Sequence, residues 1–110
     1  MTRRNDRRHL DDGPHAARVA LAREIARIVS ERGLTQREAA ELLGTAQPRI
    51  SALVSGNVEG FSLDRLVKYL NLLGEDIHIV VLPKPSEREH ACTWVINAAA
   101  GAGTGALTHA

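Results

Sequence analysis

The chain has 110 residues, 44% of them hydrophobic and 3% aromatic, and its formal net charge is +1. This composition predicts one domain with an aliphatic core, while the single cysteine, Cys92, excludes an internal disulfide framework. No apolar run reaches the roughly 18 residues of a membrane span. No signal peptide is expected either, because charged residues interrupt the apolar positions after the basic N-terminus, and we therefore expect a cytoplasmic protein.

Residues 1–12 are polar and are predicted to form a flexible basic arm. The positive charge of the chain is concentrated in residues 1–33, which hold eight arginines against five acidic residues. Two interpretations of its arginines stay open: they contact DNA phosphates, or they belong to a disordered, solvated N-terminal segment. Asp11 and Asp12 are expected to cap a helix that has Pro14 in its first turn and ends at Gly33. Its apolar stripe is predicted to comprise Val19, Leu21, Ile25, Ile28 and Val29.

Two short helices separated by Gly44 are predicted next. Thr35 and Glu38 have the spacing of a capping box at the start of the first helix. Thr45 is expected to cap the second helix. Pro48 is tolerated there because the N–H groups of the first turn have no intrahelical partner.

A fourth helix is predicted to begin at Ser62, with Asp64 in its first turn, and to end at Gly74. Phe61 and Leu66 have the spacing of a hydrophobic staple across its start. Its buried stripe is predicted to comprise Leu63, Leu66, Val67, Leu70 and Leu73.

Residues 76–82 are short, β-branched and bounded by Gly74 and Pro83, which predicts a strand. Both faces of this strand are apolar, and the helices offer no hydrogen-bonding ladder. Its partner is therefore either the same strand of a second copy, which we favour, or residues 92–96 folding back. The predicted dimerisation residues are Ile77, Ile79, Val80 and Val81. Residues 83–110 are predicted to be a flexible tail, so the globular domain spans residues 13–82.

The segment from Leu34 to Gly56 has the pattern of two helices joined by a sharp turn. Ala40 is small enough for the two helices to cross closely, and Gly44 allows the positive φ that the turn requires. Ile50 and Leu53 are expected to anchor the second helix to the core. Its other side chains then face outward, and such a helix fits the major groove of DNA.

This segment resembles the lambda-repressor/Cro-like helix-turn-helix superfamily, also called the XRE family, and most closely its small HigA-type antitoxins. The residues that carry the resemblance are Leu34-Thr35-Gln36, Ala40, Leu43-Gly44, Gln47-Pro48, Ile50-Ser51 and Gly56, with Phe61 to Leu66 beyond them. One departure is Val54, where many members carry Glu. The resemblance implies a mainly α fold, a bundle of about four to five helices with a C-terminal strand that pairs in a dimer.

The resemblance also implies that Gln36 contacts phosphate and that Gln47, Arg49 and Ser51 read bases. Glutamine can pair with adenine through two hydrogen bonds, and arginine can pair with guanine. The full set of residues predicted to contact DNA is Gln36, Arg37, Thr45, Gln47, Pro48, Arg49, Ser51 and Ala52.

No catalytic or metal-binding constellation is found in the sequence. The five histidines form no metal-ligand pair, and Cys92 with His78 lacks the surroundings of a nucleophile. The glycines near residues 101–105 lack the strand, helix and lysine of a phosphate loop. We therefore expect no enzyme activity, no cofactor and no metal.

The predicted function is sequence-specific repression by a homodimer on a palindromic operator. From the resemblance, we expect an antitoxin that regulates its own operon and binds a small RelE/HigB-like toxin. A stand-alone regulator without a toxin is one alternative. A protein-interaction module that has lost DNA binding is another, because the motif is slightly acidic.

Overall fold

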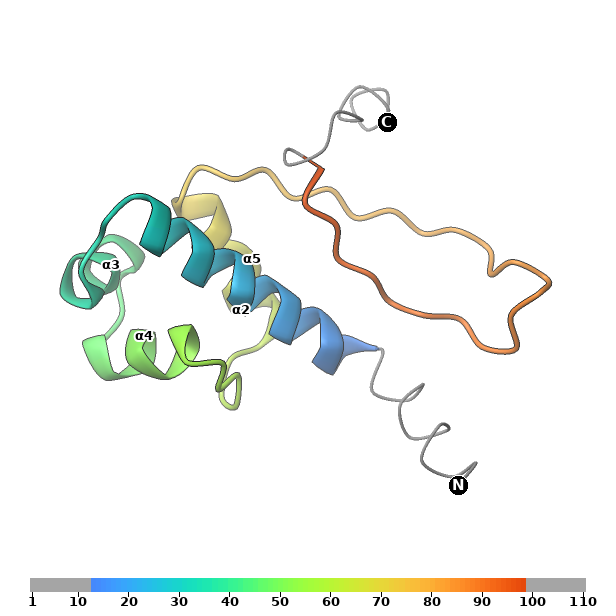
Figure 1. Cartoon of the computed structure of the whole chain (residues 1–110), viewed down its shortest axis with the longest axis horizontal. Helices are drawn as coiled ribbons and strands as arrows, with labels where there is room; N and C mark the ends of the chain where they lie inside the picture. The colour runs from blue at the N-terminus through green and yellow to red at the C-terminus, as the bar shows by residue number, and fades with distance from the viewer. Residues whose placement is uncertain (1–12, 99–110) are drawn as a thin grey trace.

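The computed structural model describes residues 13–98, and these residues form a bundle of four helices. The helices are α2 (Pro14–Glu31), α3 (Gln36–Leu43), α4 (Gln47–Val54) and α5 (Leu63–Leu72). Helix α2 is the long axis of the bundle, and α3, α4 and α5 gather along it (Figure 1). The mainly helical class and the helix-turn-helix arrangement are confirmed. The predictions for residues 1–12 and 99–110 lie outside the described part of the chain.

Helix α2 ends as predicted but begins differently. Its N-cap is Gly13, which has no side chain to accept a hydrogen bond, so the predicted aspartate cap is wrong. Pro14 follows at a position where a missing N–H costs nothing. At the other end Gly33 has φ +64°, and the N–H of Leu34 donates to the carbonyl of Val29 at 3.0 Å. This is the Schellman pattern, which satisfies carbonyls that the last turn leaves unpaired.

One continuous core joins the four helices and the loop before α5. The largest fully buried side chains are Ile25, Ile50, Leu53, Leu66 and Leu73. The predicted stripes of α2 and α5 supply seven of the sixteen buried residues of the core cluster, although Val19, Leu63 and Val67 are only partly buried. Val58, Phe61 and Tyr69 are buried as well. This core packs α4 against α2 and α3, and α3 against α5.

Helix α5 begins and ends where the sequence predicts. The Ser62 side chain accepts a hydrogen bond from the N–H of Arg65 at 3.1 Å, and Asp64 lies in the first turn. Phe61 and Leu66, the predicted staple, are 4% and 0% exposed. Gly74 follows the helix with φ +91°. The chain then leaves the bundle.

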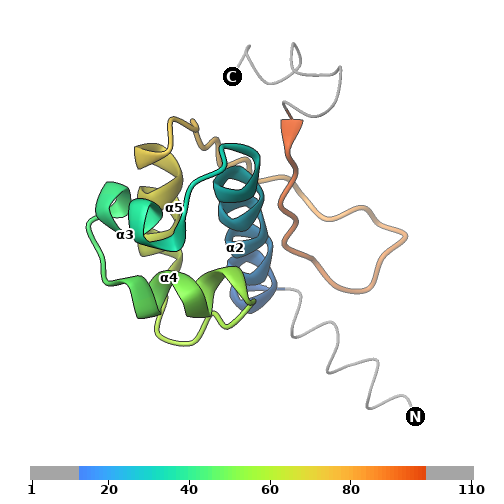
Figure 2. The ribbon, with the colours of Figure 1, turned by 60° about the vertical axis from the view of Figure 1, so that its left-hand side comes forward.

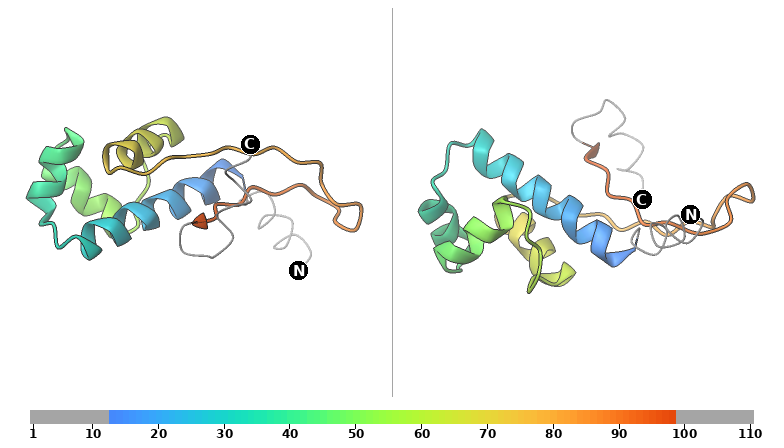
Figure 3. Two further views of the ribbon diagram at one scale, coloured as in Figure 1. Left: turned by 90° about the horizontal axis from the view of Figure 1, so that it is seen from above. Right: turned by 60° about the horizontal axis from the view of Figure 1, so that its bottom comes forward.

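Residues 75–97, called the extended loop below, run away from the bundle and return to α2 (Figures 1 and 3). Ile77 packs against the core at one end, and the side-chain amide of Asn97 donates to Glu24 of α2 at 2.8 Å at the other end. Residues 76–82 are not assigned as a strand, because no backbone ladder pairs them with another segment among residues 13–98. Residues 92–96, in the returning half of the extended loop, form no backbone hydrogen bonds with residues 76–82. Pairing with a second copy stays a prediction.

None of the helices in residues 13–98 is long and apolar enough to cross a membrane.

Candidate nucleic-acid interface

Helix α3 begins with a complete capping box that places Gln36 and Arg37 in the first turn. The Thr35 hydroxyl accepts from the N–H of Glu38 at 3.0 Å, and the Glu38 carboxylate accepts from the N–H of Thr35 at 2.9 Å. Gln36 is half-buried, and Arg37 is exposed. The first N–H groups of a helix point outward without intrahelical partners, which suits a phosphate.

Gly44 makes the turn between α3 and α4. Its φ is +70°, and the N–H of Thr45 donates back to the carbonyl of Ala40 at 2.9 Å. Thr45 therefore closes α3 and does not cap α4. The N-cap of α4 is Ala46, whose side chain makes no cap hydrogen bond, so the predicted threonine cap is wrong. Thr45 is half-buried beside the turn.

Helix α4 is eight residues long and is attached to the core through Ile50 and Leu53, which are 0% and 1% exposed. Gln47, Pro48 and Ser51 are exposed on its opposite side, and Ala52 is half-buried. Figure 2 shows α4 along the edge of the bundle, with α2, α3 and α5 on its other side. Most of the predicted DNA-contacting residues of α4 therefore share one outward face.

Arg49 behaves differently from the other predicted DNA-contacting residues. Its guanidinium carbon lies 4.4 Å from the centre of the Phe61 ring. Its Nη2 group donates to the carbonyl oxygen of Gly60 at 3.2 Å. The side chain is half-buried against the loop that joins α4 to α5. Analysis of the sequence missed this contact.

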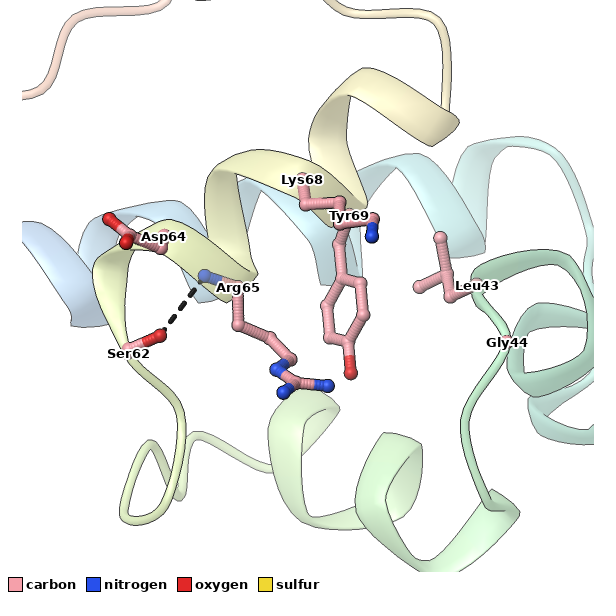
Figure 4. A pocket seen from close by; sticks show the side chains of 7 residues that line it. All are labelled: Leu43, Gly44, Ser62, Asp64, Arg65, Lys68 and Tyr69. Carbon is pink, nitrogen blue, oxygen red and sulfur yellow. Dashed lines mark hydrogen bonds between the residues drawn. The ribbon is translucent and has the colours of Figure 1, made fainter.

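A pocket of about 280 Å³ lies between the turn at Gly44 and helix α5 (Figure 4). Arg65 and Lys68 bring positive charge to its wall, and Asp64 brings a carboxylate. Tyr69 also lines the pocket, and its hydroxyl is buried and has no hydrogen-bond partner within the described residues. The charges of this wall are mixed, so the pocket has no single ligand preference.

Residues 13–98 contain no group of three histidine, cysteine or acidic side chains placed to hold a metal ion.

Comparison with known proteins matches residues 11–82 to a family described as "Helix-turn-helix domain", a range that contains all four helices. The chain is also similar to a solved structure assigned to the XRE family of transcriptional regulators. The TM-score is 0.73, the sequence identity is 36%, and the match covers 79% of this chain and 98% of that one. No curated protein matches. The chain thus belongs to the helix-turn-helix domain family and is an XRE-like transcriptional regulator.

Proposed function

We propose that this protein is a sequence-specific DNA-binding repressor that places helix α4 in the major groove. One observation carries the proposal: α4 is anchored by two fully buried residues and directs Gln47, Pro48 and Ser51 to solvent on one face. A helix presented in this way can insert its N-terminal residues between the phosphate strands and reach base edges.

The side chains of this face differ in the contacts that they can make. Gln47 can pair with the adenine edge through two hydrogen bonds, and the Ser51 hydroxyl can donate or accept. The methyl group of Ala52 suits the thymine methyl. At the start of α3, Gln36 and Arg37 are placed for phosphates, which fix the register without selecting a sequence.

The experiment is selection from a random duplex library, followed by binding of the selected operator and of a scrambled duplex at fixed salt. The proposal predicts one enriched inverted repeat and a higher affinity for it than for the scrambled DNA. Enrichment of no sequence, with no binding even at low salt, would favour the protein-interaction module.

We also propose that the repressor is a homodimer joined through the extended loop. Seven of the nine large hydrophobic side chains that are exposed in residues 13–98 belong to this loop: Ile79, Val80, Val81, Leu82, Trp94, Val95 and Ile96. Large apolar patches are rare on the surface of a monomer, so this concentration of exposed apolar side chains in one loop favours an interface. The unpaired backbone of residues 76–82 would find its ladder partner in the same segment of a second copy.

The antitoxin role rests on the resemblance of about residues 18–82 to HigA-type antitoxins. Its test is the neighbouring reading frame, which should encode a small basic RelE/HigB-like protein that co-purifies with this chain. A neighbour of any other kind would leave a stand-alone regulator.

A further inference from the structure

Arg49 lies on a different side of α4 from Gln47. Successive residues of an α-helix are rotated by about 100° around its axis. Arg49 is therefore about 160° from Gln47 by the shorter way round the helix, whereas Ser51 is only about 40° from Gln47. Arg49 directly precedes the buried anchor Ile50 and is itself half-buried. It therefore occupies the flank of α4 that faces the loop between α4 and α5.

The partners of Arg49 on that flank are well fixed. Phe61 is only 4% exposed and packs edge-on against Tyr69, with ring centres 6.4 Å apart. The backbone N–H of Phe61 donates to the carbonyl of Val58 at 3.1 Å, and the Val58 side chain is also buried. The arginine thus joins α4 to the loop at Gly60 and Phe61 through a stacked face and a hydrogen bond.

The first three residues of α4 contribute no buried side chain. The helix has eight residues and no side-chain cap, and its buried anchors are its fourth and seventh residues, Ile50 and Leu53. Gln47, at its first position, depends on the first turn for its direction. A tie from Arg49 to Phe61 and Gly60 supplies a third attachment close to Gln47.

We infer that Arg49 is a positioning residue that fixes the first turn of α4, and that base selection belongs to Gln47 and Ser51. The inference rests on the proposed function. The terminal amino groups that arginine uses to grip guanine include the Nη2 group already bound to Gly60. To read a base, the guanidinium would have to leave both Gly60 and Phe61.

The test compares Arg49→Lys with Gln47→Ala and Ser51→Ala on the selected operator and its single-base variants. Arg49→Lys keeps the charge and loses the planar stacking face. It should lower operator affinity about tenfold, leave the affinity for scrambled DNA unchanged, and weaken preference only at the base pairs that Gln47→Ala and Ser51→Ala identify. Arg23→Lys, at an exposed position of α2, is the matched control and should change nothing.

Two results would overturn the inference. A base pair whose preference is lost only in Arg49→Lys would make Arg49 a base reader. Unchanged binding by Arg49→Lys would show that the stacked guanidinium is not needed to position α4.

The contact between Arg49 and Phe61 can also be tested by changing Phe61. Phe61→Leu should reproduce the pattern, and the double variant with Arg49→Lys should be no worse than the poorer single variant, because both changes break the same contact. Additive losses would contradict the tie.

Amide hydrogen exchange of the DNA-free protein tests the tie even if Phe61→Leu does not fold. Exchange at Arg49 and Ile50, whose N–H groups donate to the carbonyl of Ala46 in the first turn of α4, should quicken in Arg49→Lys and stay the same in Arg23→Lys; unchanged exchange in Arg49→Lys would contradict the inference. If the wild-type protein binds no DNA, the proposed function fails, and this measurement still decides whether Arg49 holds the first turn of α4.

Discussion

Gln36 and Gln47 each occupy the first position of a helix, yet they are expected to make different contacts. Gln36 starts α3 beside the capping box, and Gln47 starts α4 on its exposed face. Gln47→Ala should weaken operator binding by about 1–3 kcal/mol and relax preference at one base pair. Gln36→Ala should weaken all sequences to a similar extent, because a phosphate contact positions without specifying.

Titrations of both variants against operator and scrambled DNA at one salt concentration separate the two roles. Arg23→Ala serves as the control for a surface change away from α3 and α4. Equal losses on both DNAs for Gln47→Ala would remove Gln47 from base readout.

Substitutions of Gly44 test whether the turn between α3 and α4 requires a left-handed backbone conformation. A Cβ at this position would meet nothing within 4 Å, so a substitution acts through the backbone conformation at φ +70° and not through a clash. Gly44→Ala should therefore lower the free energy of unfolding by about 1–2 kcal/mol, the cost of the left-handed region for an ordinary residue. Urea denaturation measures this change. Gly44→Asn should cost less, because asparagine tolerates that region. Equal stability of Gly44→Ala and wild type would show that the turn can relax.

At the residue scale, the prediction that Arg49 reads a base alongside Gln47 stays a prediction. Their two-residue separation places the two side chains on different sides of a helix. That spacing was visible in the sequence. The stacking partner was not, because Phe61 is twelve residues further along and reaches Arg49 only after the loop has folded.

At the scale of elements, the start of α3 depends on a reciprocal pair of hydrogen bonds. Thr35→Ala removes the acceptor for the N–H of Glu38 and should lower the free energy of unfolding by about 1 kcal/mol. Thr35→Ser keeps a hydroxyl and should retain most of the stability. Thermal unfolding of the three proteins gives the comparison. A loss in Thr35→Ser as large as in Thr35→Ala would assign the effect to the threonine methyl group instead of the cap.

The helices were predictable to the extent that local chemistry alone determines their ends. The capping box at Thr35, the Ser62 cap and the glycines after α2, α3 and α5 follow from short-range hydrogen bonding and backbone freedom. The start of α4 was not predictable in this way, since Thr45 is engaged in closing α3 and leaves Ala46 at the cap. Where two helices are separated by so short a turn, one residue cannot serve both ends.

At the scale of the whole molecule, the extended loop shows that a strand-like sequence forms no strand where the described part of the chain offers it no partner. A short β-branched run bounded by Gly74 and Pro83 predicted a strand at residues 76–82, but a strand also needs a paired neighbour. The described residues contain none for it. Ile77 lies against the core, whereas Ile79 and Val81 are 83% and 89% exposed. The proposed dimer would bury them.

The homodimer is therefore tested through the loop. A large aliphatic side chain gains about 1.5–3 kcal/mol when it becomes fully buried, so a partner that covers several of them would be held firmly. Light scattering should show a wild-type dimer, and Val81→Asp should shift it to a monomer by placing a charge in the interface. Its melting temperature at low concentration should stay close to wild type, because Val81 contributes nothing to the core of one chain.

Leu72→Asp is the matched control, because Leu72 is 47% exposed on α5, outside the loop, and its substitution should leave the dimer intact. On DNA, the Val81→Asp monomer should bind a single half-site about as well as wild type does. It should lose the preference for an inverted repeat with half-sites about 34–36 Å apart, which only two linked copies of α4 can span. A wild-type monomer in solution, or a dimer that survives Val81→Asp and Ile79→Pro alike, would mean that another surface joins the copies or that the repressor acts alone.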